Sequence, residues 1–275
     1  MTPSNVVRRL LLPVLAFAAG WSNLVPARAA DCEEISAYQQ AVSPGASGGP
    51  GLTVGVVIHI VETKGHPCEV RKVWTPEQVS IIFGADTQDE QSVNSIWGST
   101  KVRFVVREVD LNKNDPPEDL MDPQQRVTVP TSGPKGTEKY EKAFDVLLAE
   151  NHRDHQVNVY LWRRIAGSPV GFGRSTRSGN GKATVFLDNE CSQKSLKVCA
   201  TYAAHELGHT LGLYHAGRNT CSAVDAQFRD LCTSLAKSCP GVKLSSRLMT
   251  PAALGRKLCP LEVKQAELMA TNEFQ

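Results

Sequence analysis

Three histidines and one glutamate occur in the sequence at a spacing that could build a metal centre. His205 and His209 are four residues apart, so on a helix they lie one turn apart on the same face and can share one metal ion. Glu206 is rotated by about 100° from His205 around such a helix. It would flank the metal, where a carboxylate can accept a proton from a metal-activated water. Gly212 can adopt φ > 0, which ends the helix and turns the chain so that His215 becomes a third nitrogen ligand.

Three protein ligands with an open fourth position are typical of a catalytic zinc site rather than a structural one. The segment 205–215 follows the pattern H-E-x-x-H-x-x-G-x-x-H and resembles the signature of the metzincin zinc peptidases. An amphipathic core helix with two partly exposed histidines would explain the first half of the pattern. It would not explain the glycine and the third histidine.

The metzincin resemblance implies a methionine-bearing turn downstream, and Leu248 and Met249 provide one. Met249 would form a hydrophobic floor beneath the metal without binding it. Some metzincins have a tyrosine two residues after this methionine, but Pro251 occupies that position here. The residue after the third histidine is Ala216, which matches none of the best-known subfamilies. The subfamily therefore stays unassigned, and no tyrosine is expected to assist zinc and Glu206.

The resemblance implies a zinc-dependent endopeptidase that acts on protein or peptide substrates. His205, His209 and His215 would hold one catalytic Zn²⁺, and Glu206 would be the general base that takes a proton from water. One alternative is a secreted interaction or adhesin module that binds zinc without turnover. The intact glutamate argues against it, because such a module needs no base. A disulfide-stapled envelope protein without metal is a second alternative.

Residues 1–29 have the features of a secretory signal peptide. Arg8 and Arg9 form a basic start, an apolar run covers residues 10–21, and residues 27–29 form an A-x-A cleavage pattern. The apolar run is shorter than the roughly 20 residues that a spanning helix needs. We therefore expect a secreted or periplasmic protein with no stable membrane anchor after cleavage.

Charge and cysteines narrow the functional class further. Removing the three arginines of the signal peptide takes the 30 basic residues to 27, against 28 acidic ones, so no basic surface for nucleic acid is expected. All eight cysteines lie in the mature chain, and an even number in an exported protein indicates disulfides. Cys191 and Cys199 could clamp the approach to the active-site helix. The absence of any C-x-x-C pair argues against a structural zinc site.

Residues 30–52 end in a run of proline and glycine and are predicted to be a flexible N-terminal segment. Cys32 could be a thiolate ligand of resting zinc if this segment were inhibitory. Its surroundings lack the cysteine-switch signature of matrix metalloproteinases, which favours a half-cystine.

Residues 53–275 are predicted to form one catalytic domain of the α/β (α+β) class. Strands are expected at 53–62, 102–109, 157–165, 170–176 and 183–187. Helices are expected at 75–83, 137–152, 196–211, 224–237 and 261–271. A further helix is expected to begin at residue 86 and to extend to about residue 97. The resemblance implies more detail: a twisted, mostly parallel five-stranded sheet, the active-site helix and a small disulfide-rich C-terminal subdomain.

The edge strand of that sheet would bind substrate by adding an extended peptide through backbone hydrogen bonds. By resemblance, the residues involved are Gly171, Phe172, Gly173 and Arg174. His59, in the first strand, is expected to be a packed core histidine rather than a ligand.

Residues 110–136 are predicted to be a polar surface loop. Asp110, Asn112 and Asn114 resemble the start of a calcium loop. Asp115 and Met121 occupy the positions where such a loop needs glycine and glutamate. Calcium is therefore possible but unsupported.

Overall fold

The structure is a computed structural model that describes residues 32–42, 51–62, 68–84, 91–112, 127–128, 151–162, 165–166, 172–173, 183–188, 195–215, 239, 242–250 and 255–274. The contacts separate a unit Met1–Asp31 from a unit Cys32–Gln275, and every described residue belongs to the second unit. The predicted signal peptide and the expected helix at 224–237 lie outside the described residues, as does all but the end of the one at 137–152. None of the helices in the described ranges has the length and apolar character needed to cross a membrane.

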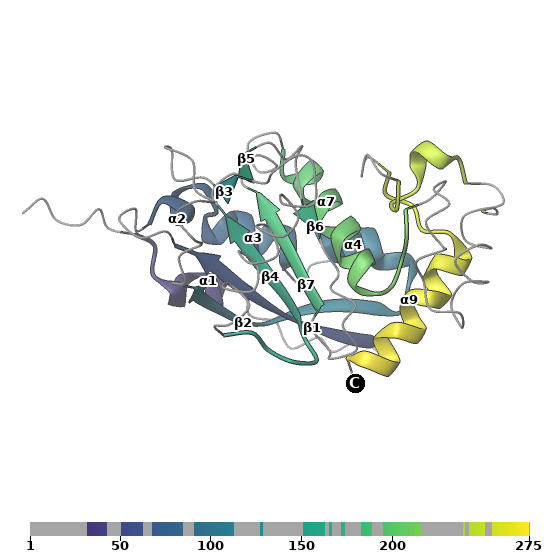
Figure 1. Ribbon diagram of the computed structural model, residues 1–275, viewed down its shortest axis with the longest axis horizontal. Coiled ribbons are helices and arrows are strands. Elements are labelled where there is room, and N and C mark those ends of the chain that lie inside the picture. The colour runs from purple at the N-terminus through teal and green to yellow at the C-terminus, as the bar shows by residue number, and fades with distance from the viewer. Residues whose placement is uncertain are drawn as a thin grey trace, which may run out of the picture. The chain divides into compact units, whose positions relative to one another are not determined.

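Four parallel strands form the centre of the described structure (Figure 1). In spatial order they are β2 (Val102–Asn112), β1 (Leu52–Val61), β4 (Val157–Trp162) and β7 (Ala183–Asp188). A two-residue strand, β6 (Phe172–Gly173), pairs antiparallel with β7 at the edge. A separate short parallel ladder joins β3 (Val127–Thr128) to β5 (Ile165–Ala166). Parallel strands combined with helices confirm the predicted α/β class.

Along the chain, helices lie before, between and after the strands of the sheet. They are α1 (Ile35–Val42), α2 (Glu69–Val73), α3 (Pro76–Phe83), α4 (Val93–Ile96), η1 (Trp97–Ser99), α7 (Leu196–Thr210), η4 (Leu244–Ser246) and α9 (Pro260–Glu273). The start of α3 is as predicted: Thr75 accepts a hydrogen bond from the backbone of Gln78, and the Gln78 side chain accepts one from the backbone of Thr75.

Alternate residues of the central strands point into one apolar core. Val56, Ile58 and Ile60 of β1 are fully buried there, together with Ala203 and Leu207 of α7. The side chains of alternate β1 residues therefore share one core with the apolar face of α7. Helix α7 therefore packs into the core that the sheet strands help to form.

The opposite side of β1 carries His59, which is fully buried as predicted. Its Nδ1 lies 2.7 Å from an Asp110 oxygen and its Nε2 lies 2.9 Å from the Asn158 side-chain oxygen. The ring also stacks on Tyr160, with the ring centroids 4.5 Å apart. Asp110 lies within β2 and not in a loop, because the strand continues to Asn112. The prediction that the polar loop begins at Asp110 was therefore wrong.

The prediction that residues 30–52 are all flexible was also wrong. Residues 35–42 form α1, and Tyr38 is fully buried in the core. Ile35, Tyr38 and Val42 have helical spacing on one face, but the proline- and glycine-rich run that begins after Val42 obscured this signal. Because the helix has only eight residues, packing rather than propensity must stabilise it.

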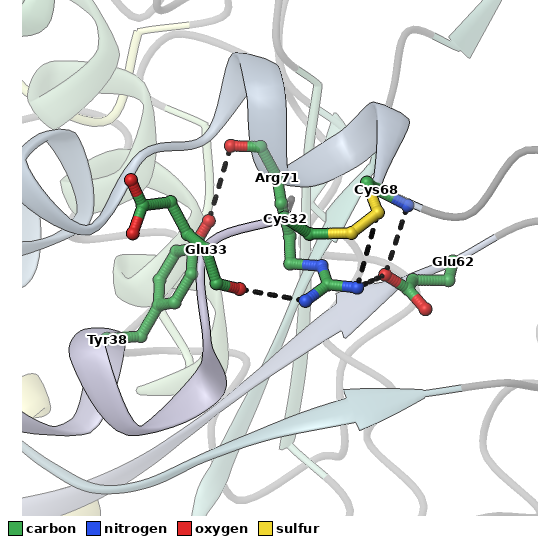
Figure 2. Close-up of a disulfide and its surroundings, with 6 residues drawn as sticks. All are labelled: Cys32, Glu33, Tyr38, Glu62, Cys68 and Arg71. Atoms are coloured by element: carbon green, nitrogen blue, oxygen red, sulfur yellow. Dashed lines mark hydrogen bonds and ion pairs between the residues drawn. A yellow bond between two sulfur atoms is a disulfide. The ribbon is translucent and has the colours of Figure 1, made fainter. Parts of the chain in front are cut away.

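A disulfide and a partly buried ion pair tie α1 to the sheet (Figure 2). Cys32 is joined to Cys68, so the half-cystine interpretation is confirmed. The Arg71 guanidinium pairs with Glu62 at 2.5 Å and donates to the Glu33 carbonyl at 2.8 Å. Glu62 also accepts a hydrogen bond from the Cys68 backbone at 3.3 Å. The start of the unit is thereby attached to the end of β1.

Replacing both cysteines, Cys32→Ala with Cys68→Ala, should lower the free energy of unfolding. The disulfide closes a loop with a sequence separation of 36, for which a loss of about 2–4 kcal/mol is expected from the gain in unfolded-chain entropy. Denaturant unfolding of the variant and the wild type measures the difference. An unchanged value would mean that the apolar contacts of α1 are sufficient to hold it.

Candidate metal centre

Helix α7 carries the first two predicted ligands and begins and ends close to the expected residues. Ser195 caps its start, since the serine side chain accepts a hydrogen bond from the Val198 backbone. The helix ends at Thr210, one residue before the predicted end. The indole of Trp97 donates a hydrogen bond to the Ala204 carbonyl, which anchors the helix beside His205.

The end of α7 is a Schellman turn centred on Gly212. Gly212 has φ of 74°, as the sequence predicted, a conformation that costs glycine little. The Leu213 backbone N–H donates to the Gly208 carbonyl at 2.9 Å, and the Gly212 N–H donates to the His209 carbonyl at 3.0 Å. These two hydrogen bonds close the helix and reverse the chain. The reversal brings His215 back toward the last turn of α7.

The three histidines meet through their Nε2 atoms. The Nε2 of His205 lies 3.1 Å from that of His209 and 3.1 Å from that of His215, and the remaining distance, His209 to His215, is 3.2 Å. Three nitrogens of a tetrahedron whose centre lies about 2.0–2.1 Å from each are about 3.3–3.4 Å apart. The observed triangle is therefore close to the size that one metal ion requires.

Backbone carbonyls determine which ring nitrogen faces that triangle. His205 donates from Nδ1 to the Leu248 carbonyl at 2.7 Å, and His209 donates from Nδ1 to the Leu213 carbonyl at 2.8 Å. Because a carbonyl only accepts, both Nδ1 atoms carry the proton. In the neutral rings both Nε2 atoms then present lone pairs to the centre. Donation of this kind is how proteins orient histidine ligands of metals.

Burial keeps these two imidazoles neutral. Desolvation lowers the pKa of His205 to about 4, with the Leu248 hydrogen bond opposing the shift. Desolvation, together with the nearby His205, lowers the pKa of His209 to about 3. Neutral imidazole is the form that binds metals. The residues therefore fit a metal ion: among the described residues His205, His209 and His215 form a cluster able to hold one.

Glu206 follows His205 on α7, and only 7% of it is exposed. Burial, with the Glu206 charge nearby, raises the pKa of Tyr202, which lies one turn earlier on the helix. The carboxylate therefore sits in a partly desolvated region beside the ligands.

Met249 packs directly against the helix at Gly208. A Cβ atom placed on Gly208 would lie 2.6 Å from Met249 Sδ, which is closer than nonbonded atoms approach. Met249 is fully buried, as is Leu248, whose carbonyl holds His205. Sequence reasoning singled out Met249 but treated Gly208 as a variable position of the motif. It also missed the two carbonyls, because every residue has one.

The proposed substrate-binding residues are only partly described. Phe172 and Gly173 form β6, which pairs with Phe186 and Val185 of β7 at the edge of the sheet. Gly171 and Arg174 lie outside the described residues. The short edge strand runs antiparallel to its neighbour.

Comparisons with known proteins leave the family unassigned. No protein-family model matches the chain, and no curated protein matches it. A solved structure titled "Structure of a chaperone-substrate complex" aligns with a TM-score of 0.35 and 15% sequence identity, over 62% of this chain. The chain spans 28% of the length of that protein. At this TM-score the likeness supports no conclusion about fold or function.

The contact between Gly208 and Met249 predicts a coupled effect of substitutions. Alanine is favoured over glycine in a helix by about 1 kcal/mol, yet Gly208→Ala should lower the free energy of unfolding by about 1–3 kcal/mol because the core is overpacked. In a Met249→Ala background the same change should be neutral or stabilising. Denaturant unfolding of the four metal-free proteins measures the coupling. Equal effects in both backgrounds would contradict the contact.

Proposed function

We propose that this protein is an exported zinc-dependent endopeptidase of the metzincin type. The observation that carries the proposal is the convergence of three Nε2 atoms, with the buried Glu206 next to His205 on the same helix. The order of chain elements supports it as well: parallel strands and an antiparallel edge segment precede the ligand-bearing helix, and a buried methionine turn follows.

Zinc suits this site better than a hard cation does. An all-imidazole set favours zinc, copper, iron or nickel, whereas calcium and magnesium prefer oxygen ligands. Three protein nitrogens with tetrahedral spacing and one open position are typical of catalytic zinc. The disulfides Cys32–Cys68 and Cys239–Cys259 support folding in an oxidising compartment, consistent with export.

Each residue of the site then has a defined task. A bound zinc ion supplies a Lewis acid that acidifies water and polarises a carbonyl group. His205, His209 and His215 would hold the ion through Nε2. Glu206 accepts the proton of the attacking water on its carboxylate and delivers it to the nitrogen of the leaving amine. The backbone of β6 would align an extended peptide beside the site.

Glu206→Gln tests the assignment of the base. The amide keeps the shape of the side chain but cannot accept the proton, so hydrolysis of casein or gelatin should fall by about 10²–10⁴-fold. Zinc content measured by elemental analysis should stay at the wild-type level. A variant that still cleaves at the wild-type rate would overturn the proposal. So would a zinc-loaded wild type that cleaves nothing, which would favour a binding module without turnover.

His215→Ala tests the ligand set. His215 is half-buried at the end of the turn, so its removal should leave the core intact. Loss of one of three ligands should weaken zinc binding by on the order of 100-fold or more, since even loss of an outer-shell partner costs 10–100-fold. The control is His155→Ala, which removes an exposed histidine. Equal zinc affinity in the two variants, measured by chelator competition, would show that His215 is not a ligand.

A further inference from the structure

The turn at Leu248 and Met249 supplies two contacts to the metal centre. The Leu248 carbonyl accepts the hydrogen bond of His205, and Met249 packs beneath Gly208. Both contacts require the turn to hold one position against α7. The structure shows what holds it on the side away from the histidines.

A short backbone clasp joins the turn to the chain just before α9. Leu248 donates to the Lys257 carbonyl at 2.7 Å, and both Arg256 and Lys257 donate to the Ser246 carbonyl. Arg247 and Lys257 form a parallel bridge. Gly255 lies so close that a Cβ there would be 2.1 Å from the Arg247 carbonyl oxygen. The two segments are therefore in direct backbone contact.

A buried ion pair connects the same turn to the first turn of α9. The Arg247 guanidinium lies 2.5 Å from one Glu262 oxygen, and the two side chains are 5% and 2% exposed. The other Glu262 oxygen accepts a hydrogen bond from the Cys259 backbone at 2.6 Å. Cys259 is joined to Cys239 by a disulfide. Arg247 is thus held by a glutamate that is itself fixed at a capped, cross-linked helix start.

We propose that Arg247 and Glu262 are a positioning pair for the metal ligand His205. The pair fixes the backbone position of residue 247 and thereby the position of the adjacent Leu248 carbonyl. The Leu248 carbonyl in turn sets the direction of the His205 ring. The inference rests on the proposed function only in taking the metal to be zinc. It adds two residues, neither of which touches the metal, to those that determine the affinity of the site.

Stability alone gives little reason for such a pair. Desolvating two charges offsets most of their attraction, and apolar residues of similar volume are often equally stabilising. A glutamate whose two oxygens accept from an arginine and from a backbone N–H does, however, restrict geometry closely, since charge-assisted hydrogen bonds are short and strong. Partners one step removed from a metal ligand commonly change metal affinity by about 10–100-fold.

A second pair in the same protein offers a matched control. Arg71 and Glu62 also form a short ion pair, both side chains are 12% exposed, and Glu62 accepts from the backbone of the disulfide-bonded Cys68 (Figure 2). The pair of Arg71 and Glu62 therefore has the same combination of arginine, glutamate and half-cystine as the pair of Arg247 and Glu262. Arg71 donates its other hydrogen bonds to Glu33 and Cys68, and not to the turn at Leu248.

The test compares two neutralised pairs. Arg247→Met with Glu262→Gln removes both charges and keeps an acceptor for the Cys259 backbone, and Arg71→Met with Glu62→Gln is the control. Zinc affinity is measured by chelator competition, and the Co²⁺-substituted proteins are compared by their visible ligand-field spectra. Near-UV circular dichroism and the cooperativity of unfolding of the metal-free proteins establish that each variant is folded.

We expect the Arg247/Glu262 variant to bind zinc about 10–100-fold more weakly, with an altered Co²⁺ spectrum. The control variant should match the wild type in both measurements. Zinc affinity within about twofold of wild type in a folded Arg247/Glu262 variant would overturn the inference, as would an equal loss in the control.

If the double variant does not fold, Arg247→Lys replaces it, because lysine keeps the charge but not the fork geometry. The expectation is again a weaker zinc complex, and an unchanged affinity would overturn the inference. These measurements do not depend on peptide hydrolysis. A wild type that binds zinc but cleaves no peptide contradicts the proposed function alone. A wild type that binds no zinc overturns both.

Discussion

The hydrogen bond between His205 and the Leu248 carbonyl joins the two halves of the metal centre. On one side is α7, fixed by the sheet and by Trp97. On the other is a turn that backbone hydrogen bonds join to the segment just before α9. The 2.7 Å contact is fully enclosed by protein, so water cannot substitute for either partner. Any displacement of the turn therefore changes the direction in which the His205 lone pair points.

The His209 ligand depends on a different and more local constraint. Its Nδ1 donates to Leu213, only four residues later, and the Schellman turn at Gly212 places that carbonyl. The same turn delivers His215. One ligand is thus oriented by distant structure and two by the immediate end of the helix. In such a centre the positions of His209 and His215 are set locally by the end of the helix. The orientation of His205 depends on tertiary packing.

The features predictable from sequence are those determined by neighbours along the chain. Helical spacing fixed the relation of His205 to His209, and the need for φ > 0 identified Gly212. The capping residues of α3 and the apolar run of β1 were equally local. These patterns were sufficient for the α/β class and for a set of three candidate ligands.

The features missed were determined by residues far apart in sequence. The requirement for glycine at 208 exists only because Met249 packs there, and the burial of Arg247 depends on Glu262. A backbone carbonyl such as that of Leu248 carries no signature in its side chain. Helix α1 was hidden by the composition of the segment that follows it, since glycine and proline next to a short helix dominate any local average.

The clasp and the ion pair also impose an order on assembly. The candidate metal ligands end at His215, but the residues that hold Leu248 in place extend to Glu262 in α9. During synthesis, the ligands therefore leave the ribosome before the structure that orients them. The centre reaches its final geometry only when α9 has docked, so a later-made part of the protein governs when an earlier part becomes competent.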